Sequence, residues 1–470
     1  ETRIGYIGRL SYSFNDKYFL DLAARRDASY LFAPDKRVGY FPSVSAGWRI
    51  SEEPFLKHIV PDNILSDLKI RASYGIMGDD GTQLGLPAYA YMEGYTYNQS
   101  VAIIGGIPIV GSRDRGVPIT NVSWLKSRMT DIGVDFSIMN GKLTGTFDYF
   151  YRKRTGLRGR KTNVLIPSEI GYTLPDENIN SDAQYGQEFS LNYNGKVGKV
   201  NFSMGGNISY SRQKFLESYN PVFFNSWDHY RNSQEQRFTK INWGYESIGQ
   251  FQSQEEINAY PVNIDGKGNR TLLPGDIIYK DQNGDGKIDG FDERPIGLGA
   301  GTQPNINYGF NIALSYRGFD FHADFSGAAG YTWFQNYETR WAFQNDGNLN
   351  TIFLDRWHRA DMRDPNSAWI PGKYPALRFN DAEHSNYDNS DFWAHNVKYL
   401  RARTIELGYS VPVRLLGVVK MQKARFYANV YNLFSIDNLS EFDIDPEIND
   451  DNGLQFPQSQ VFNIGCNLSF

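Results

Sequence analysis

Hydrophobic and polar residues alternate along many segments of this chain with a period of two. Between Val200 and Ser211 the even positions are apolar or Gly, and the odd positions are Asn, Ser or Gly. The same division recurs over Pro304 to Arg317 and, after a turn, over Phe319 to Ser326. Because successive side chains of a β-strand point to opposite faces, this pattern predicts strands with one apolar face and one polar face.

Extending the same reading along the chain predicts about 14 strands. Most of them reach the roughly 9 to 11 residues that a tilted membrane-spanning strand needs, whereas strands of soluble proteins average about 5 to 6. We therefore expect an all-β fold, a transmembrane antiparallel β-barrel. The predicted strands lie near residues 3–14, 17–28, 38–50, 67–77, 124–139, 143–156, 184–195, 200–211, 242–252, 304–317, 319–326, 396–410, 422–434 and 459–470.

The connections between these strands alternate between short and long. Tight hairpins are predicted at Asn15-Asp16, Asn140-Gly141, Asn194 to Lys199 and Arg317-Gly318. Two longer turns at the same end, 51–67 and 411–421, are each expected to contain a helical turn. The long polar connections should form an extracellular cap, because outer-membrane barrels have short periplasmic turns and longer outer loops. They cover residues 29–37, 78–122, 157–183, 213–302, 333–395 and 435–457.

Composition supports a membrane barrel over a soluble β-protein. Aromatic residues make up 15% of the 470 residues, Gly occurs 45 times, and the mean hydropathy is still −0.51. A barrel explains this combination, since its rings face lipid while its lumen stays polar. No run approaches the roughly 18 apolar residues of a spanning helix. The net charge of −5 gives no reason to expect nucleic acid as a partner, and the single Cys466 excludes an internal disulfide.

The two ends of the chain suggest the C-terminal part of a larger protein. Glu1 to Gly8 has the pattern of a strand and not of a secretion signal, so we expect the native polypeptide to begin upstream. The last strand alternates apolar and polar residues up to Phe470. A final strand with an aromatic terminal residue resembles the assembly signal of outer-membrane barrels.

Several stretches, taken in order, resemble the SusC/RagA-type TonB-dependent transporters of the Bacteroidetes outer membrane. The resemblance covers essentially the whole chain. It is carried by FPSVSAGWRISEEPF (Phe41 to Phe55), LKIRASYGIMG (Leu68 to Gly78), DIGVDFSIMNGKLTGTFDYFYRKRTGL (Asp131 to Leu157), GDIIYKDQNGDGKIDGFDERPIG (Gly275 to Gly297), YLRARTIELGYSVP (Tyr399 to Pro412), FYANVYNLFSI (Phe426 to Ile436) and the last strand.

The resemblance implies a barrel of roughly 22 strands with a plugged lumen. Residues 1–470 would then be its C-terminal part, with the plug domain and the first strands absent from this chain. It implies location in the outer membrane of a Gram-negative bacterium and contact with its lipid. The implied partners are the missing N-terminal portion, a TonB complex acting through that portion, and a SusD-like surface lipoprotein, assembled as a dimer of transporter–lipoprotein pairs. A glycan oligomer is the implied substrate class, with oligopeptides as the alternative.

One loop motif predicts a structural calcium site. In DQNGDGKIDGFD, oxygen ligands fall at the spacing of a calcium loop, with Gly286 at the sharp turn and the Lys287 carbonyl at position 7. Asp at position 12, instead of Glu, departs from the EF-hand pattern. The alternative is a solvated Asp/Gly turn. The expected ligands are Asp281, Asn283, Asp285, Lys287, Asp289 and Asp292.

Aromatic residues in the long connections are candidates for ligand binding, because rings can stack on sugars or hold apolar groups. The competing interpretation is packing within the loops or an interfacial aromatic belt. The candidate residues are Trp227, Tyr230, Trp243, Trp333, Trp341, Trp357 and Trp393.

Three functions are compatible with these patterns. The first is TonB-dependent active import with a lipoprotein lid. The second is a passive porin, and the third is a soluble calcium-dependent carbohydrate-binding β-protein. The six His residues show no HExxH-type spacing. We therefore expect that the chain is not an enzyme.

Overall fold

The computed structural model describes residues 2–61, 63–81, 86–161, 164, 167, 169, 171–219, 222–299, 303–379, 381, 383–416, 421–448 and 452–470. The chain divides into two compact units. Unit 1 comprises Glu1–Tyr193 and Ser209–Thr239, and unit 2 comprises Asn194–Ile208 and Lys240–Phe470.

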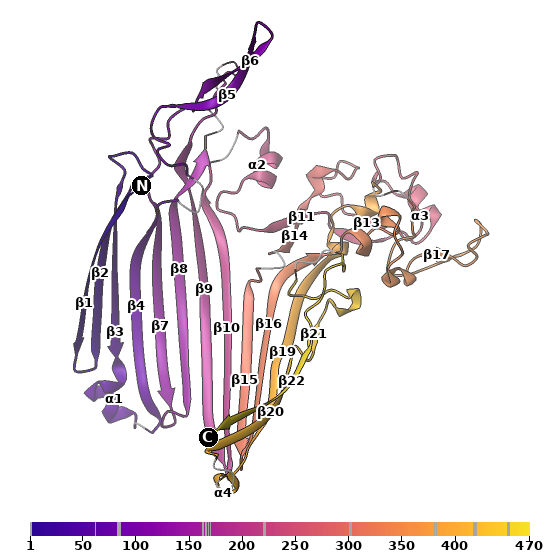
Figure 1. The fold of residues 1–470 in the computed structure, drawn as a ribbon. Coiled ribbons are helices and arrows are strands. Elements are labelled where there is room, and N and C mark those ends of the chain that lie inside the picture. Colours follow the sequence, from indigo (N-terminus) through magenta and orange to yellow (C-terminus); the bar gives the residue numbers. More distant parts are fainter. Residues whose placement is uncertain are drawn as a thin grey trace. The chain divides into compact units, whose positions relative to one another are not determined.

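Unit 1 is built on long antiparallel strands in the order β1-β2-β3-β4-β7-β8-β9-β10, with β9 and β10 each contributing part of their length (Figure 1). Their bounds are β1 Arg3–Phe14, β2 Tyr18–Ser29, β3 Val38–Arg49, β4 Leu65–Asp79, β7 Leu125–Ile138, β8 Leu143–Arg160, β9 Asp176–Val197 and β10 Val200–Glu217.

The register between β4 and β7 shows how the alternating sequence makes two faces. Ile70 pairs with Val134, and Arg71 pairs with Gly133, so apolar pairs and polar pairs alternate along the ladder. Ile70 is 40% exposed and Ile132 is 49% exposed, although both are apolar. A sheet with one exposed apolar face and one polar face is what the sequence pattern predicts.

The tight turns at one end of the strands have left-handed backbone conformations. Asn15 and Asp16 both have φ near +50°, which matches the twist of a two-residue hairpin. At the next such turn, Met139, Asn140 and Gly141 have φ of 56°, 57° and 80°. Both are predicted hairpins, and both join neighbouring strands.

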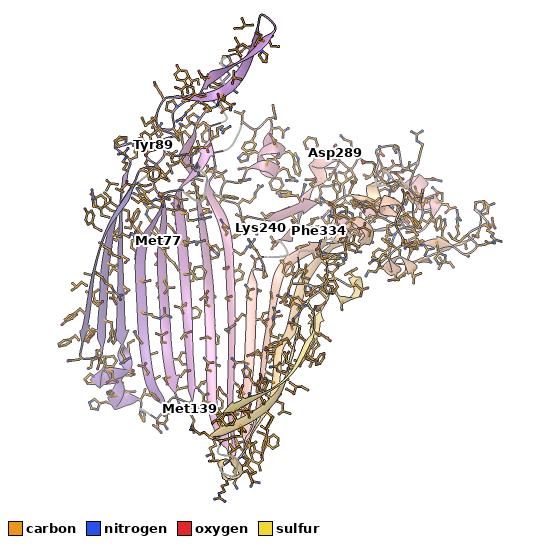
Figure 2. All side chains as sticks on the ribbon, viewed as in Figure 1. Met77, Tyr89, Met139, Lys240, Asp289 and Phe334 are labelled. Atoms are coloured by element: carbon orange, nitrogen blue, oxygen red, sulfur yellow. The ribbon has the colours of Figure 1, made fainter. Side chains whose placement is uncertain are left out.

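The two ends of unit 1 differ (Figure 1). Met139 marks the short-turn end, where η1 (Ile50–Glu52) and α1 (Pro54–Ile59) form the predicted helical turn, and Tyr89 lies toward the opposite end (Figure 2). At that opposite end, residues of two long connections form a small apolar core around Phe32 and Val122. The hairpin of β5 (Tyr95–Ile104) and β6 (Ile107–Asp114) projects from it, and α2 (Ser226–Asn232) lies in the connection after β10.

Unit 2 contains a second run of long antiparallel strands in the order β15-β16-β19-β20-β22, with β21 also pairing with β19. The bounds are β15 Ile306–Tyr316, β16 Phe319–Phe334, β19 Ala394–Ser410, β20 Lys423–Tyr431, β21 Ser435–Asp437 and β22 Val461–Ser469. The predicted turn at 411–421 is described up to Leu416 and contains α4 (Val413–Leu416); residues 417–420 lie outside the described residues.

The long connections of unit 2 fold into a compact region with its own apolar cores. One core surrounds Phe251, Tyr279 and Trp393, and another surrounds Tyr331 and Phe442. The elements of this region are β11 Ile241–Gly244, β12 Ser247–Gln250, α3 Gln254–Ala259, β13 Ile277–Tyr279, η4 Gly290–Asp292, β14 Arg294–Leu298, η5 Tyr337–Thr339, η6 Gln344–Asp346, η7 Thr351–Leu354, β17 His358–Arg359, β18 Trp369–Ile370, η8 Ser385–Tyr387, η9 Asp391–Trp393 and η11 Ser440–Phe442.

The structure corrects two sequence-based predictions. The strand predicted over 242–252 is not a long strand, because β11 and β12 pair separately with β14 and β13 inside the folded connection. The hairpin of β5 and β6 lies within the long connection 78–122, where the sequence pattern predicted no strand. Elsewhere each predicted strand coincides with a long strand, although β9 begins at Asp176 and not near 184, and β16 extends to Phe334 and not only to 326. Among the described residues, none of the helices has the length and apolar character needed to cross a membrane.

Candidate functional site

The polar face of unit 1 carries a charge cluster centred on Arg71. Its guanidinium lies 3.3 Å from Asp131, 3.2 Å from Asp135 and 2.6 Å from Asp148. The strands β4, β7 and β8 place these four side chains side by side through their register. This cluster therefore holds three carboxylates against one guanidinium.

A second polar contact on the same face involves β8, β9 and β10. Arg154 donates from Nε to Asp182 at 2.8 Å, and Gln213 donates to the same carboxylate at 2.7 Å. Asp182 is only 2% exposed, so these donors replace the hydrogen bonds that water would otherwise make to its carboxylate.

The polar face of unit 2 has a similar arrangement. Arg425 of β20 donates to Glu406 of β19 at 2.6 Å and bonds to Asp320 of β16. Asn429 donates to the other Glu406 oxygen at 3.0 Å. His322 lies 2.7 Å from Asp324 on the same face of β16. Alternate residues of these strands therefore line this face with charged and amide groups. The sequence pattern predicts such a polar face for a solvated lumen.

A hollow of about 720 Å³ lies at the long-loop end of β1 to β4. Phe41 and Trp124 line it, with ring centroids 5.2 Å apart, and the ion pair of Arg3 with Asp80 (2.8 Å) forms another part of its wall. Sequence reasoning missed this place. Phe41 occupies a polar-face position of its strand, and that departure from alternation is the signal that could have identified it.

Three of the seven aromatic candidates are packed inside unit 2, with Trp357 and Trp393 in its folded connections and Trp333 near the end of β16. Trp393 is fully buried and lies on Tyr374 at 5.9 Å with nearly parallel rings, while Trp357 and Trp333 are 3% and 7% exposed. In this conformation neighbouring side chains cover their rings, so the rings offer no face to a ligand. Their burial favours the packing interpretation.

The other four candidates keep part of their surface exposed. In unit 1, Trp227 and Tyr230 of α2 pack against each other at 5.4 Å, and Tyr230 is 41% exposed. In unit 2, Trp243 and Trp341 are half-buried. Trp243 lies in β11, whereas Trp341 contacts Tyr337 and Tyr387 edge to face. Two of these four lie in each unit, and ligand binding by them stays a prediction.

The predicted calcium loop has the turn geometry that such a loop needs. Gly284 and Gly286 have φ of 78° and 80°, and Gly286 occupies the position of the sharp turn. Asp281 accepts hydrogen bonds from the backbone amides of both glycines, at 2.7 and 2.8 Å. These amides lower the pKa of Asp281 and favour its charged form.

The remaining ligand positions of this loop are engaged in other contacts. Asp289 bonds to the Lys287 ammonium at 2.6 Å, which lowers the pKa of Asp289. Asp285 accepts from the Lys287 amide, and Asn283 accepts from the Asp285 amide. Asp292 is buried and accepts from two backbone amides. No three acidic, His or Cys side chains converge in a metal-binding arrangement within the described ranges.

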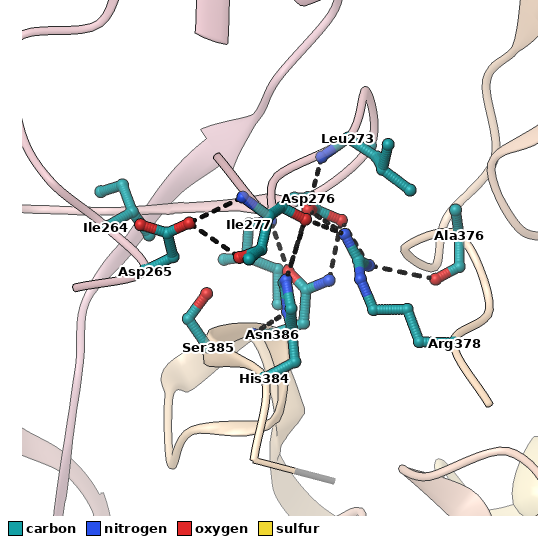
Figure 3. Close-up of polar contacts among 12 residues, drawn as sticks. Ile264, Asp265, Leu273, Asp276, Ile277, Ala376, Arg378, His384, Ser385 and Asn386 are labelled. Carbon is teal, nitrogen blue, oxygen red and sulfur yellow. Dashed lines mark hydrogen bonds and ion pairs between the residues drawn. The ribbon is translucent and has the colours of Figure 1, made fainter. Parts of the chain in front are cut away.

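A buried polar network ties two distant segments of the connections together (Figure 3). Arg378 donates to Asp276 at 2.9 Å, and Asn386 donates to the same oxygen at 2.8 Å. Nδ1 of His384 accepts from the Asn386 amide, and Nε2 lies 3.4 Å from the Thr271 carbonyl. The polar groups of this network bond to one another, which indicates that the network holds the two segments of the connections together.

Sequence comparison relates the chain over its whole length to TonB-dependent receptors. It is 28% identical to "TonB-dependent receptor SusC" of Bacteroides thetaiotaomicron over 100% of the chain and 44% of that protein. It is 27% identical to "TonB-dependent receptor P26" of Formosa agariphila over 99% of the chain and 46% of that protein. The chain thus spans less than half the length of these relatives. No protein-family model matches it.

Comparison of folds finds the same architecture in solved structures. A structure of the RagAB peptide importer in its open-open state matches with a TM-score of 0.71 at 19% identity, covering 100% of the chain and 47% of the other. The closed-closed state gives 0.69 at 20% identity, covering 100% and 48%. The predicted resemblance to SusC/RagA-type transporters is confirmed, as are the barrel-type β-fold and the outer-membrane location. The relatives are named as receptors, which agrees with the expectation that the chain is not an enzyme.

Proposed function

We propose that this chain, an outer-membrane protein whose relatives are TonB-dependent receptors, forms part of a TonB-dependent importer of a nutrient. Its strands supply barrel wall, and its long connections supply the extracellular surface that meets the ligand. The observation that carries the proposal is the similarity to TonB-dependent receptors over 98% or more of the chain. The alternation of an apolar and a polar face along the strands supports it independently.

The partner that completes the wall is the N-terminal portion of the same transporter, with its plug. Within the described residues, no strand pairs with the outer edge of β1 or of β22. An unpaired strand edge in lipid leaves backbone N–H and C=O groups without partners at a high cost. Additional strands on these edges would remove that cost. The charges around Arg71 and Arg425 give a plug polar groups to contact, and TonB would act through that plug.

The proposed substrate is a glycan oligomer, with an oligopeptide as the second candidate. The half-exposed rings of Trp227, Tyr230, Trp243 and Trp341 support either class, because a ring can stack on a sugar face or an apolar side chain. In the hollow beside β1 to β4, Phe41 is buried, and the half-buried ring of Trp124 adds a further aromatic surface near the Asp80 carboxylate. The solved RagAB structure is described as a peptide importer, and this keeps the second candidate in view.

The proposed lid is a SusD-like surface lipoprotein, in a dimer of transporter–lipoprotein pairs. The hairpin of β5 and β6 supports a protein partner at the long-loop end. Its apolar side chains are strongly exposed, with Tyr97 at 77% and Ile103 at 76%. An isolated two-stranded hairpin is marginally stable in water, so cover by another protein would stabilise it.

The loop of Asp281 to Asp292 is proposed to bind calcium in a structural role. Asp281, Asn283, Asp285 and Asp289 would hold the ion together with the Lys287 carbonyl, and Asp292 would complete the set. Calcium would replace the Lys287 ammonium as the counter-charge of these carboxylates. The glycine turn supports this use of the loop.

Growth of a deletion strain tests the proposed function. The full-length gene, with the gene of its lipoprotein partner, is returned to the strain, and growth is measured on glycan oligomers and on oligopeptides as the sole carbon source. We expect growth on one class to depend on the returned gene. Mass spectrometry of material that copurifies with the intact complex identifies the ligand. Equal growth with and without the gene on every substrate would contradict import.

A further inference from the structure

The short helical turn after β3 is anchored on the apolar face of the wall. Glu53, which directly precedes α1, accepts hydrogen bonds from the Tyr18 hydroxyl and from the Trp48 indole at 3.1 Å. Tyr18 and Trp48 are paired in register on β2 and β3, and both are at least 40% exposed. They occupy the same face as Leu20, Leu22 and Val44. The start of α1 is therefore attached to the face that meets lipid.

The sequence of α1 makes one side of this turn apolar. Pro54 begins the helix, and the Val60 amide closes it by donating to the Leu56 carbonyl at 2.8 Å. Phe55 and Ile59 are four residues apart and thus lie on the same side of the helix. They are 53% and 74% exposed.

The opposite side of α1 is charged. Lys57 lies two positions after Phe55, which places it about 200° around a helix of 3.6 residues per turn. Its ammonium is bonded to Glu52 at 2.6 Å. The turn is therefore amphipathic, with Phe55 and Ile59 exposed on one side and the Lys57–Glu52 ion pair on the other; His58, between them, is also exposed.

Exposed apolar side chains continue along the same end of unit 1. Phe14, at the end of β1, is 50% exposed; Ile64, just before β4, and Met139, in the turn after β7, are 57% and 51% exposed. The Met139 amide donates to the Ile64 carbonyl at 3.1 Å, so these two residues belong to one surface. Apolar residues gathered at a barrel rim beside Tyr and Trp are typical of the membrane–water interface.

We propose that α1 is embedded in the phospholipid leaflet at the short-turn end, with Phe55 and Ile59 among the acyl chains. The occupant of this surface is lipid because the anchor residues Tyr18 and Trp48 already face lipid and α1 continues their face. A helical turn that lies in the interface inserts its apolar side about 5 to 10 Å deep. This inference rests on the outer-membrane location and not on the proposed transport function.

Lipid-depth quenching of a fluorescent label tests the proposal on the full-length transporter. A variant with Cys466→Ala, and any cysteines outside this chain replaced, receives Ile59→Cys and is labelled with bimane. The protein is placed in nanodiscs of phosphatidylethanolamine and phosphatidylglycerol, with or without brominated acyl chains. Lys57→Cys, on the opposite side of the same turn, is the matched control. Leu22→Cys, on the apolar face of β2, marks full lipid contact.

We expect brominated lipid to quench the Ile59→Cys label about threefold more than the Lys57→Cys label, close to the value for Leu22→Cys. Aqueous iodide should show the reverse order. Two results would overturn the proposal. Quenching of the Ile59→Cys label by iodide alone would place this side in water. Protection from both quenchers would show that another part of the protein covers it.

Discussion

The Arg378 guanidinium forms an ion pair with the Asp276 carboxylate where water scarcely reaches either group. The two side chains are 9% and 0% exposed, and they are separated by 102 residues in the chain. The Leu273 amide and the Asn386 side chain also donate to Asp276, each at 2.8 Å. Because every oxygen of the carboxylate is bonded, the pair fixes one connection of unit 2 against another.

Removal of one partner of this pair should loosen the folded connections. Arg378→Met leaves a buried carboxylate without its counter-charge, which costs about 3–5 kcal/mol. Hydrogen exchange at the Ile277 amide, which donates to Asn386, reports the local opening. Arg363→Met, in an exposed turn, is the control and should leave this amide protected. Equal protection in both variants would show that the pair contributes nothing to the local structure.

The stability of the same region should fall as the pH drops from about 7 to 5. Burial, and then the charge of Arg378, lower the pKa of His384. When the region unfolds, His384 returns to a pKa of about 6.5 and takes up a proton that the folded form does not bind. The contribution of neutral His384 to the stability of this region is therefore complete above a pH of about 6.5 and is lost as the pH falls below it.

Asp388 contributes with the opposite sign and must be removed for a clear result. Burial raises its pKa to about 6, so its folded form gains stability as the pH falls from 6 toward 4. We therefore compare Asp388→Asn with Asp388→Asn/His384→Asn, using hydrogen exchange between pH 7 and 5 corrected for intrinsic rates. In the single variant, the protection of amides in this region from hydrogen exchange should fall as the pH drops from 7 to 5. If the double variant loses as much, His384 is not the group responsible.

Substitution of two tryptophans should separate packing from ligand contact. Trp393→Ala removes a ring from a core in which its indole donates to the Asn386 carbonyl at 2.7 Å, and this should cost about 3–5 kcal/mol of local stability. Trp341→Ala removes a half-buried ring and should cost less. It should instead weaken ligand binding about tenfold, or about 1.4 kcal/mol, in calorimetry with the identified ligand. Unchanged affinity in Trp341→Ala would remove this residue from the proposed surface.

Calcium should protect the loop of Asp281 to Asp292 from hydrogen exchange. Binding to the folded form alone stabilises it by about 2.7 kcal/mol when the ion is at 100 times its Kd. Asp285→Ala should abolish the effect, because it removes one proposed ligand from an exposed position. Asp361→Ala, which removes a comparable turn aspartate elsewhere, should not. Identical exchange in calcium and in a chelator would favour the simple Asp/Gly turn.

Most of the wall was predictable because its strands obey a local rule. The alternation over 200–211 and 304–317 indicates directly which side chains share the apolar face, and Asn15-Asp16 forms a left-handed turn that those residues tolerate. The segment 242–252 also has strand character, but its partners, β14 and β13, lie in the same folded connection. Periodicity shows that a segment forms a strand, and it does not show which strand it pairs with.

The candidate sites were less predictable because they depend on contacts distant in sequence. Trp393 and Trp341 look alike in the sequence, yet one is fully buried against Tyr374 and the other is half-exposed. The ion pair of Asp276 with Arg378 joins residues that have no local pattern in common. The calcium-type motif, in contrast, is local, and its glycine turn appears where the sequence places it.

Energy-dependent uptake by the full-length transporter tests the central claim most directly. Labelled ligand is supplied to cells that carry the full-length gene, in strains with and without TonB, and accumulation is followed before and after the proton gradient is collapsed. Our account predicts accumulation above the external concentration that disappears in both the TonB-deficient and the de-energised cells. Uptake that only equilibrates the ligand and is the same in all these cells would contradict it and would indicate a passive porin.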